Sequence, residues 1–164
     1  MELNLNDLIN AQINTELWSA YLFLSMSVNA NSKNLKGVAN WFYIQYQKEL
    51  SDAKKIIDYL NSTNNKVYLY PIEGVPSEWD TALEMFKHKL EHEQKIYKII
   101  HAIAKIAEEK QDYAALNFLI DFAKEQIKEE NITKKIITEF EAVKDNEYAL
   151  YLLDKKLGER KNIL

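Results

Sequence analysis

Cysteine is absent from the 164 residues of this chain, and glycine and proline are scarce, with three and two copies. Without thiols the chain can form no disulfide, thiolate zinc site, iron–sulfur cluster or cysteine nucleophile. Because glycine and proline interrupt helices, their scarcity indicates long uninterrupted helices rather than a sheet. The hydrophobic content of 47% is ordinary for a globular protein, and the length suits one domain spanning residues 1–164.

Long apolar runs and a strong charge imbalance are also lacking. No run approaches the roughly 20 apolar residues that cross a bilayer, and the N-terminus has no basic stretch followed by an apolar core. The net charge of -4, without a basic patch, argues against a nucleic-acid partner. We therefore expect a cytoplasmic protein whose partners include neither a membrane nor a nucleic acid.

Apolar periodicity and capping residues predict five helices, at residues 5–31, 35–61, 81–108, 112–144 and 147–157. Short breaks after the first and third helices indicate antiparallel hairpins. The link over residues 61–80 holds both prolines and is long for a compact domain. A crossover along the length of a bundle explains it. The predicted fold class is all-α: a four-helix bundle with one long crossover connection and a short fifth C-terminal helix.

Four glutamates lie in the middle of helical faces that are otherwise apolar. Each has a bulky apolar residue seven positions before it and seven after it; the four are Glu16, Glu49, Glu93 and Glu129. Seven residues make two helical turns, so each carboxylate points where its apolar neighbours point. Burying four ionised carboxylates without partners is prohibitive, and the chain offers no ring of arginines to neutralise them. The pattern predicts a pair of metal ions inside the bundle.

Two of these glutamates have a second oxygen ligand three residues away. Asp52 follows Glu49, and Gln126 precedes Glu129. Residues three apart on a helix project side by side, so each pair can bind one ion or bridge two. Hard oxygen donors suit iron or manganese better than copper, and two such metals about 4 Å apart can together reduce dioxygen or peroxide. The predicted ligand set is Glu16, Glu49, Asp52, Glu93, Gln126 and Glu129.

The chain resembles the bacterial non-haem ferritins over essentially its whole length. The segments that carry the resemblance are 8–16, 21–27, 90–93, 117–119, 125–130, 151–154 and 157–160. The resemblance implies a ferritin-like fold and a hollow shell of 24 subunits. It also implies ferroxidase activity, in which dioxygen or peroxide oxidises ferrous iron for storage as a ferric mineral. The short fifth helix is then expected near the four-fold axes of the shell.

The resemblance also assigns roles to individual residues. The positions that match the family's two-iron ferroxidase ligands, and are therefore expected to be catalytic, are Glu16, Glu49, Glu93, Gln126 and Glu129. One ferrous ion is expected at Glu16, Glu49 and Asp52, and the other at Glu49, Glu93 and Glu129, with Glu49 as the bridge. Gln126 is expected to orient the oxidant or water.

Four positions depart from the family pattern. Asp52 stands where the family usually has histidine, and Phe23 stands where it usually has a tyrosine beside the site. Lys48 and Lys128 replace glutamates of a third iron site, of which Glu125 remains, so we expect that site to be absent or weak. The altered dinuclear site leaves an alternative open: a shell that binds or scaffolds iron without rapid oxidation.

Haem-binding relatives are disfavoured by two positions. Such a protein would normally have a methionine where this chain has Leu50, and a histidine where it has Glu129. We expect a dinuclear iron site and no haem.

Overall fold

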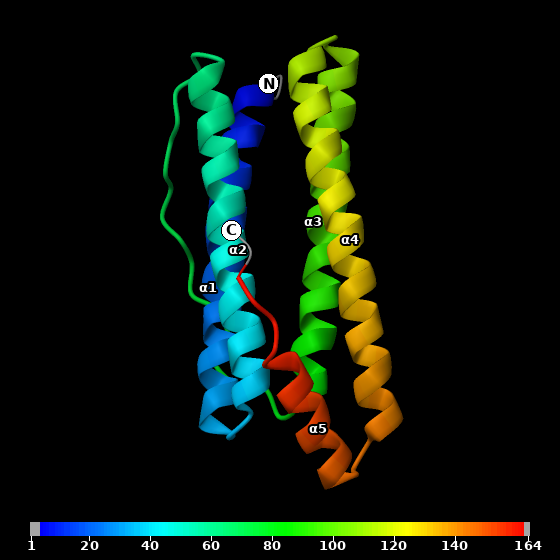
Figure 1. Cartoon of the computed structure of the whole chain (residues 1–164). Helices are drawn as coiled ribbons and strands as arrows, with labels where there is room; N and C mark the ends of the chain where they lie inside the picture. Colours follow the sequence, from blue (N-terminus) through cyan, green and yellow to red (C-terminus); the bar gives the residue numbers. More distant parts are fainter. Residues whose placement is uncertain (1–3, 163–164) are drawn as a thin grey trace. The chain divides into compact units, whose positions relative to one another are not determined.

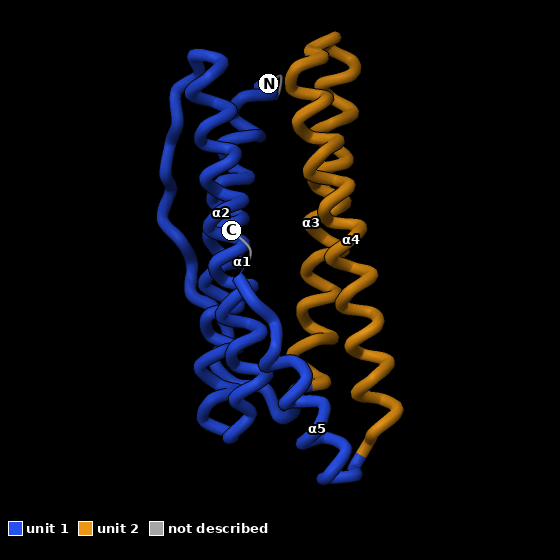
Figure 2. Tube along the Cα trace, in the orientation of Figure 1, with its two compact units in different colours: residues 1–82, 145–164 blue, residues 83–144 orange. Residues whose placement is uncertain are grey.

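The computed structural model describes residues 4–162, which contain five helices and no strand (Figure 1). The helices are α1 Leu5–Ser32, α2 Lys36–Ser62, α3 Ala82–Glu109, α4 Tyr113–Val143 and α5 Glu147–Leu157. The chain forms two compact units, one of residues 1–82 and 145–164 and the other of residues 83–144 (Figure 2). The first contains α1, α2, the crossover and α5; the second contains α3 and α4. The assignment of residues 1–164 to one domain stays a prediction.

The first unit is built on the hairpin of α1 and α2. Asn4 caps α1 by accepting the N–H of Asn6 at 2.9 Å. The turn between the helices includes Asn34, whose φ of 59° lies in the left-handed region that asparagine tolerates better than most residues. Between the helices the buried rings of Phe23 and Phe42 stack, with centroids 6.1 Å apart. Apolar burial along this seam holds the hairpin together.

The crossover between α2 and α3 runs in extended, irregular form along α1 (Figure 1). Near the start of α1, Asn10 accepts the N–H of Tyr68 at 2.8 Å and donates to the carbonyl of Lys66 at 3.0 Å. Near the end of α1, Asn29 accepts the N–H of Trp79 at 3.2 Å. Buried asparagines at both ends of α1 thus satisfy the crossover backbone, which follows the helix for most of its length.

α5 packs against the beginning of α2. Leu35 precedes α2 without a side-chain capping bond; instead the carboxylate of Asp154, on α5, accepts the N–H of Gly37 at 3.2 Å and that of Val38 at 2.8 Å. A carboxylate there satisfies helix N–H groups that have no partner in the helix and favours the positive end of the helix dipole. The approach requires glycine, since a Cβ at position 37 would lie 1.6 Å from the backbone oxygen of Asp154.

The second unit is the hairpin of α3 and α4. Asp112 caps α4 by accepting the N–H of Ala115 at 3.1 Å, and Gln111 before it turns the chain with a φ of 57°. The rings of Phe86 and Phe140 pack between the helices, with their centroids 5.5 Å apart. Both helices also bury polar side chains along this seam, and these belong to the candidate site.

No helix within residues 4–162 is long and apolar enough to cross a membrane.

The packing of α5 against α2 can be tested by substitutions at Gly37 and at Asp154. Gly37→Ala should detach α5, because the added methyl group overlaps the backbone of Asp154. Asp154→Ala should lower the free energy of unfolding by about 1–2 kcal/mol, because it removes a helix cap. Denaturant unfolding measures both effects, with Asp154→Asn as a control that keeps an acceptor oxygen and should lose less. Equal stability of Asp154→Ala and the wild type would contradict the capping role.

Candidate metal centre

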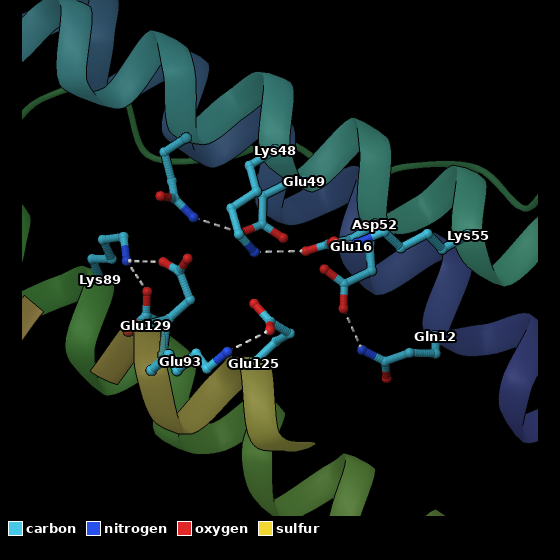
Figure 3. A network of polar contacts seen from close by, with 12 residues as sticks. Gln12, Glu16, Lys48, Glu49, Asp52, Lys55, Lys89, Glu93, Glu125 and Glu129 are labelled. Carbon is cyan, nitrogen blue, oxygen red and sulfur yellow. Dashed lines mark hydrogen bonds and ion pairs between the residues drawn. The ribbon is translucent and has the colours of Figure 1, made fainter. Parts of the chain in front are cut away.

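Three carboxylates of the first unit converge inside the α1–α2 hairpin. Glu16 comes from α1, and Glu49 and Asp52 come from successive turns of α2. None is more than 6% exposed, and one oxygen of each lies within 4.8 Å of the others (Figure 3). Buried carboxylates at this separation repel one another unless a cation or a proton lies among them. The geometry suits a single cation bound by three side chains.

A glutamine one turn earlier orients each of the two glutamates. Gln12 donates to Oε1 of Glu16 at 2.8 Å, and Gln45 donates to Oε1 of Glu49 at 2.9 Å. Both glutamines are buried. The other oxygen of each carboxylate, Oε2, is buried without a hydrogen-bond partner among the described residues. A buried acceptor without a partner is costly, so these two oxygens are positioned for a cation.

The same environment changes the acidity of the two glutamates. Burial raises the pKa of Glu16 well above its ordinary value of 4.5, and the neighbouring carboxylates of Glu49 and Asp52 raise it further. Burial also raises the pKa of Glu49. Without a cation, the pair therefore keeps a proton over a pH range in which exposed glutamates are ionised. A metal ion that binds here must displace that proton.

Lysines surround Asp52. Lys48 Nζ lies 3.1 Å from Oδ2 of Asp52, and Lys55 Nζ lies 3.6 Å from Oδ1. Lys48 thus directs a positive charge at a predicted ligand. Lys128 forms an exposed ion pair with Glu125 at 3.2 Å. The absence or weakness of a third iron site stays a prediction.

Two glutamates of the second unit share a buried lysine. Lys89, on α3, is 0% exposed, and its ammonium contacts Oε1 of Glu93. The same Nζ lies 3.3 Å from Oε2 of Glu129 on α4 and donates to Oγ1 of Thr133 at 2.9 Å. Figure 3 shows Lys89 directed at both carboxylates. The chain has no ring of arginines for its buried glutamates, but it supplies a lysine to this pair.

The predicted ligands thus fall into two sets, one in each unit. The first unit brings together Glu16, Glu49 and Asp52, and the second brings Glu93 and Glu129 together around Lys89. Gln126, also in the second unit, is 4% exposed, and its Oε1 has no hydrogen-bond partner among the described residues. Whether all six bind metal stays a prediction.

Several residues that contact the predicted ligands were missed in the sequence, and three of them share one spacing. They are Gln12, Gln45 and Lys89. Each stands four residues before a buried glutamate, where a helix places two side chains on the same face. That shared spacing is the signal that would have found them.

The fold is an all-α arrangement of long helices, and its first set of buried oxygens could hold a metal ion. The ferritin family, described as a ferritin-like domain, matches residues 6–143. A bacterial non-heme ferritin from Bacteroides fragilis (strain 638R) is 34% identical over 156 residues, which cover 95% of this chain and 97% of that protein. Another from Staphylococcus aureus (strain USA300) is 30% identical over 157 residues, covering 96% and 95%.

Solved ferritin structures have the same fold. The open pore ferritin from the archaeon Archaeoglobus fulgidus superposes with a TM-score of 0.95 at 38% identity, covering 98% of this chain and 99% of that one. The chain belongs to the ferritin family. The fold class predicted from the sequence is confirmed: it is all-α and ferritin-like, with a short C-terminal helix.

The raised pKa values of Glu16 and Glu49 predict how stability varies with pH. A carboxyl whose pKa is raised by folding stabilises the metal-free protein below its unfolded pKa, and that contribution is lost as the pH rises through the folded pKa. The metal-free protein should therefore lose stability above about pH 4.5, by up to ~1.4 kcal/mol per pH unit for each proton held. Stabilisation by a divalent cation should grow over the same range, because fewer protons must be displaced.

Thermal melts with a chelator and with Zn²⁺, at several pH values, measure both slopes. Glu16→Gln is the matched variant, because it keeps the shape of the side chain and removes one titrating group. It should flatten the pH dependence of the metal-free melt and reduce the Zn²⁺ effect. An unchanged pH dependence in Glu16→Gln would refute the assignment.

Proposed function

We propose that this chain takes up ferrous iron at Glu16, Glu49 and Asp52, supports its oxidation and stores the ferric product within an oligomeric shell. One observation carries the proposal: three buried carboxylates converge within 4.8 Å, and two of them present oxygens that no group of the described protein satisfies. Membership of the ferritin family supports iron as the metal. Hard carboxylate donors suit ferrous and ferric iron.

The chemistry of the step requires two electrons. Each ferrous ion loses one electron, and two such electrons with two protons convert one dioxygen molecule to hydrogen peroxide. The five carboxylates carry five negative charges, against four positive charges of two ferrous ions and six of two ferric ions. The ammonium of Lys89 adds one positive charge in either state. In this proposal Glu93 and Glu129 hold the second ion, and Gln126 orients dioxygen or water.

The protein groups around the first set have defined parts. Gln12 and Gln45 fix the rotation of their glutamates, so that Oε2 of each faces the ion. Asp52 supplies the third carboxylate, and the ammonium groups of Lys48 and Lys55, 3.1 and 3.6 Å from its two oxygens, reduce its negative charge. Since Phe23 is buried beside this unit's core, the chain offers no phenol at that position as an electron donor.

Self-association into a shell is part of the proposal. Large apolar side chains are exposed on the crossover and on α5; they are Tyr68, Leu69, Tyr70, Ile72, Tyr148, Tyr151 and Leu152. Groups of exposed apolar side chains such as these are typical of surfaces that contact another protein chain. The similarity to ferritins supports such an assembly. The number of 24 subunits and the place of α5 near four-fold axes are proposed on the resemblance.

The ferroxidase step is tested by stopped-flow mixing of the metal-free protein with two ferrous ions per subunit in aerated buffer. Glu49→Ala should slow the appearance of ferric iron by roughly tenfold or more, because it removes a ligand rather than a supporting group. Asp58→Ala is the matched control, since it removes an exposed carboxylate of α2 and should leave the trace unchanged. Equal, slow traces for the wild type and Glu49→Ala would refute ferroxidase activity at this site.

The alternative function is an assembly that binds or scaffolds iron without rapid oxidation. The observation that favours it is the ammonium of Lys89 between Glu93 and Glu129, where the second iron is proposed to bind. The same stopped-flow traces separate the two functions, because only a working dinuclear site predicts a fast phase that Glu49→Ala abolishes.

A further inference from the structure

We propose that Lys89 closes the α3–α4 ligand set, so that the wild-type chain binds one metal ion tightly at Glu16, Glu49 and Asp52 and excludes a second from Glu93 and Glu129. The inference rests on the proposed function in taking the first three carboxylates as the iron-binding set. It leaves no place for the second ion of that proposal, and it therefore favours the alternative, iron binding without rapid oxidation. Lys89 and the two carboxylates that it neutralises lie in the second unit.

The ammonium of Lys89 has three hydrogen-bond acceptors around it. An ammonium has three protons to donate. Those of Lys89 meet Oε1 of Glu93, Oε2 of Glu129 and the hydroxyl oxygen of Thr133. The side chain has no exposed surface, so water does not compete for these contacts. Lys89 is thus an internal cation that the chain itself supplies.

Thr133 reinforces the arrangement. Its hydroxyl lies 3.3 Å from Oε2 of Glu93 and 2.9 Å from the backbone oxygen of Glu129. The threonine accepts from Lys89 and is itself fully buried. Lys89, Glu93, Glu129 and Thr133 therefore form one buried network across α3 and α4, and a cation that displaced Lys89 would have to rearrange it.

A metal ion and the ammonium would need the same oxygens. A divalent ion held by Glu93 and Glu129 would lie within about 2.0–2.2 Å of an oxygen of each. Nζ of Lys89 already contacts one of these carboxylates and lies 3.3 Å from the other. Two cations at one position repel strongly in a buried site, so the ion can enter only if the lysine leaves. If the ammonium of Lys89 moved away from these carboxylates it would remain in the protein interior without them, because the side chain has no exposed surface.

The chain contains its own comparison for this position. On α1 and α2 the residue four before the buried glutamate is a neutral glutamine, and there an oxygen of the glutamate has no partner. On α3 the equivalent residue is Lys89, and its glutamate is neutralised. Asp52 of the first set also has a lysine four residues before it, Lys48, but that side chain is 22% exposed, whereas Lys89 has no exposed surface.

Lys89→Gln tests the proposal by giving α3 the neutral residue found on α1 and α2. Crystals of the wild type and the variant are soaked in Zn²⁺, which has no redox chemistry, and anomalous difference density locates the ions. The wild type should show zinc at Glu16, Glu49 and Asp52 alone, and Lys89→Gln should add zinc at Glu93 and Glu129. In solution, the variant should bind about one more Zn²⁺ per subunit and gain more thermal stability from it.

Lys95→Gln is the matched control. It removes a lysine from the same helix, but that lysine is 70% exposed and pairs with Glu91. It should reproduce the wild-type zinc sites, which separates the effect of the buried ammonium from a general loss of positive charge.

Each outcome bears on one claim. Zinc at Glu93 and Glu129 in the wild type overturns the inference and leaves the proposed function intact, and this holds even if Lys89→Gln does not fold. Failure of Lys89→Gln to gain zinc there also overturns it. Absence of zinc at Glu16, Glu49 and Asp52 in the wild type would instead refute the first ligand set, while zinc at Glu93 in the variant would still support the role of Lys89.

Discussion

Carboxylates buried on apolar helix faces impose the constraint on which this protein depends. Removing an ionised group from water costs several kcal/mol even after the protein relaxes, so each of the four glutamates requires a compensating partner. The chain meets this requirement in two ways. In the first unit burial raises the pKa of Glu16 and of Glu49, which favours the neutral carboxyl when no cation is present, and Oε2 of each lacks a hydrogen-bond partner among the described residues. In the second unit Lys89 supplies the positive charge to Glu93 and Glu129 directly.

This difference between the two units depends on how their helices hold buried polar groups. Long helices with few interruptions provide rigid positions for groups that are otherwise unfavourable in a core, and glutamines one turn away fix the direction of each carboxylate. The first set could hold a metal ion, and without one its buried carboxylates lower the stability of the protein. The second set is stable without a metal, because its network is internally complete. At a buried glutamate, the arrangement that leaves an oxygen available to a metal ion is therefore the one that lowers the stability of the metal-free protein.

The crossover and α5 show how segments outside the core hairpins are held. Asn10 and Asn29 bind the crossover backbone, so a segment without regular hydrogen bonding remains ordered along α1. Asp154 supplies the cap that α2 lacks locally, and Gly37 makes that approach possible. Both devices use side chains to satisfy backbone groups from distant parts of the chain. They also leave apolar side chains of the crossover and α5 exposed for contacts with other subunits in the proposed shell.

The helices, the crossover and the buried glutamates could be predicted from the sequence, because apolar periodicity, capping residues and the scarcity of glycine and proline act locally. The partners of the glutamates could not. Lys89 reads as an ordinary charged residue of α3 until α4 brings Glu129 and Thr133 to its ammonium. Likewise the cap that Asp154 provides to Gly37 joins residues 117 apart in the chain. The sequence by itself determined that the four glutamates lie on buried helix faces, since their burial follows from helical spacing. Only the tertiary structure decided that Lys89 is buried with two of them and which buried charges meet, since that depends on how neighbouring helices pack.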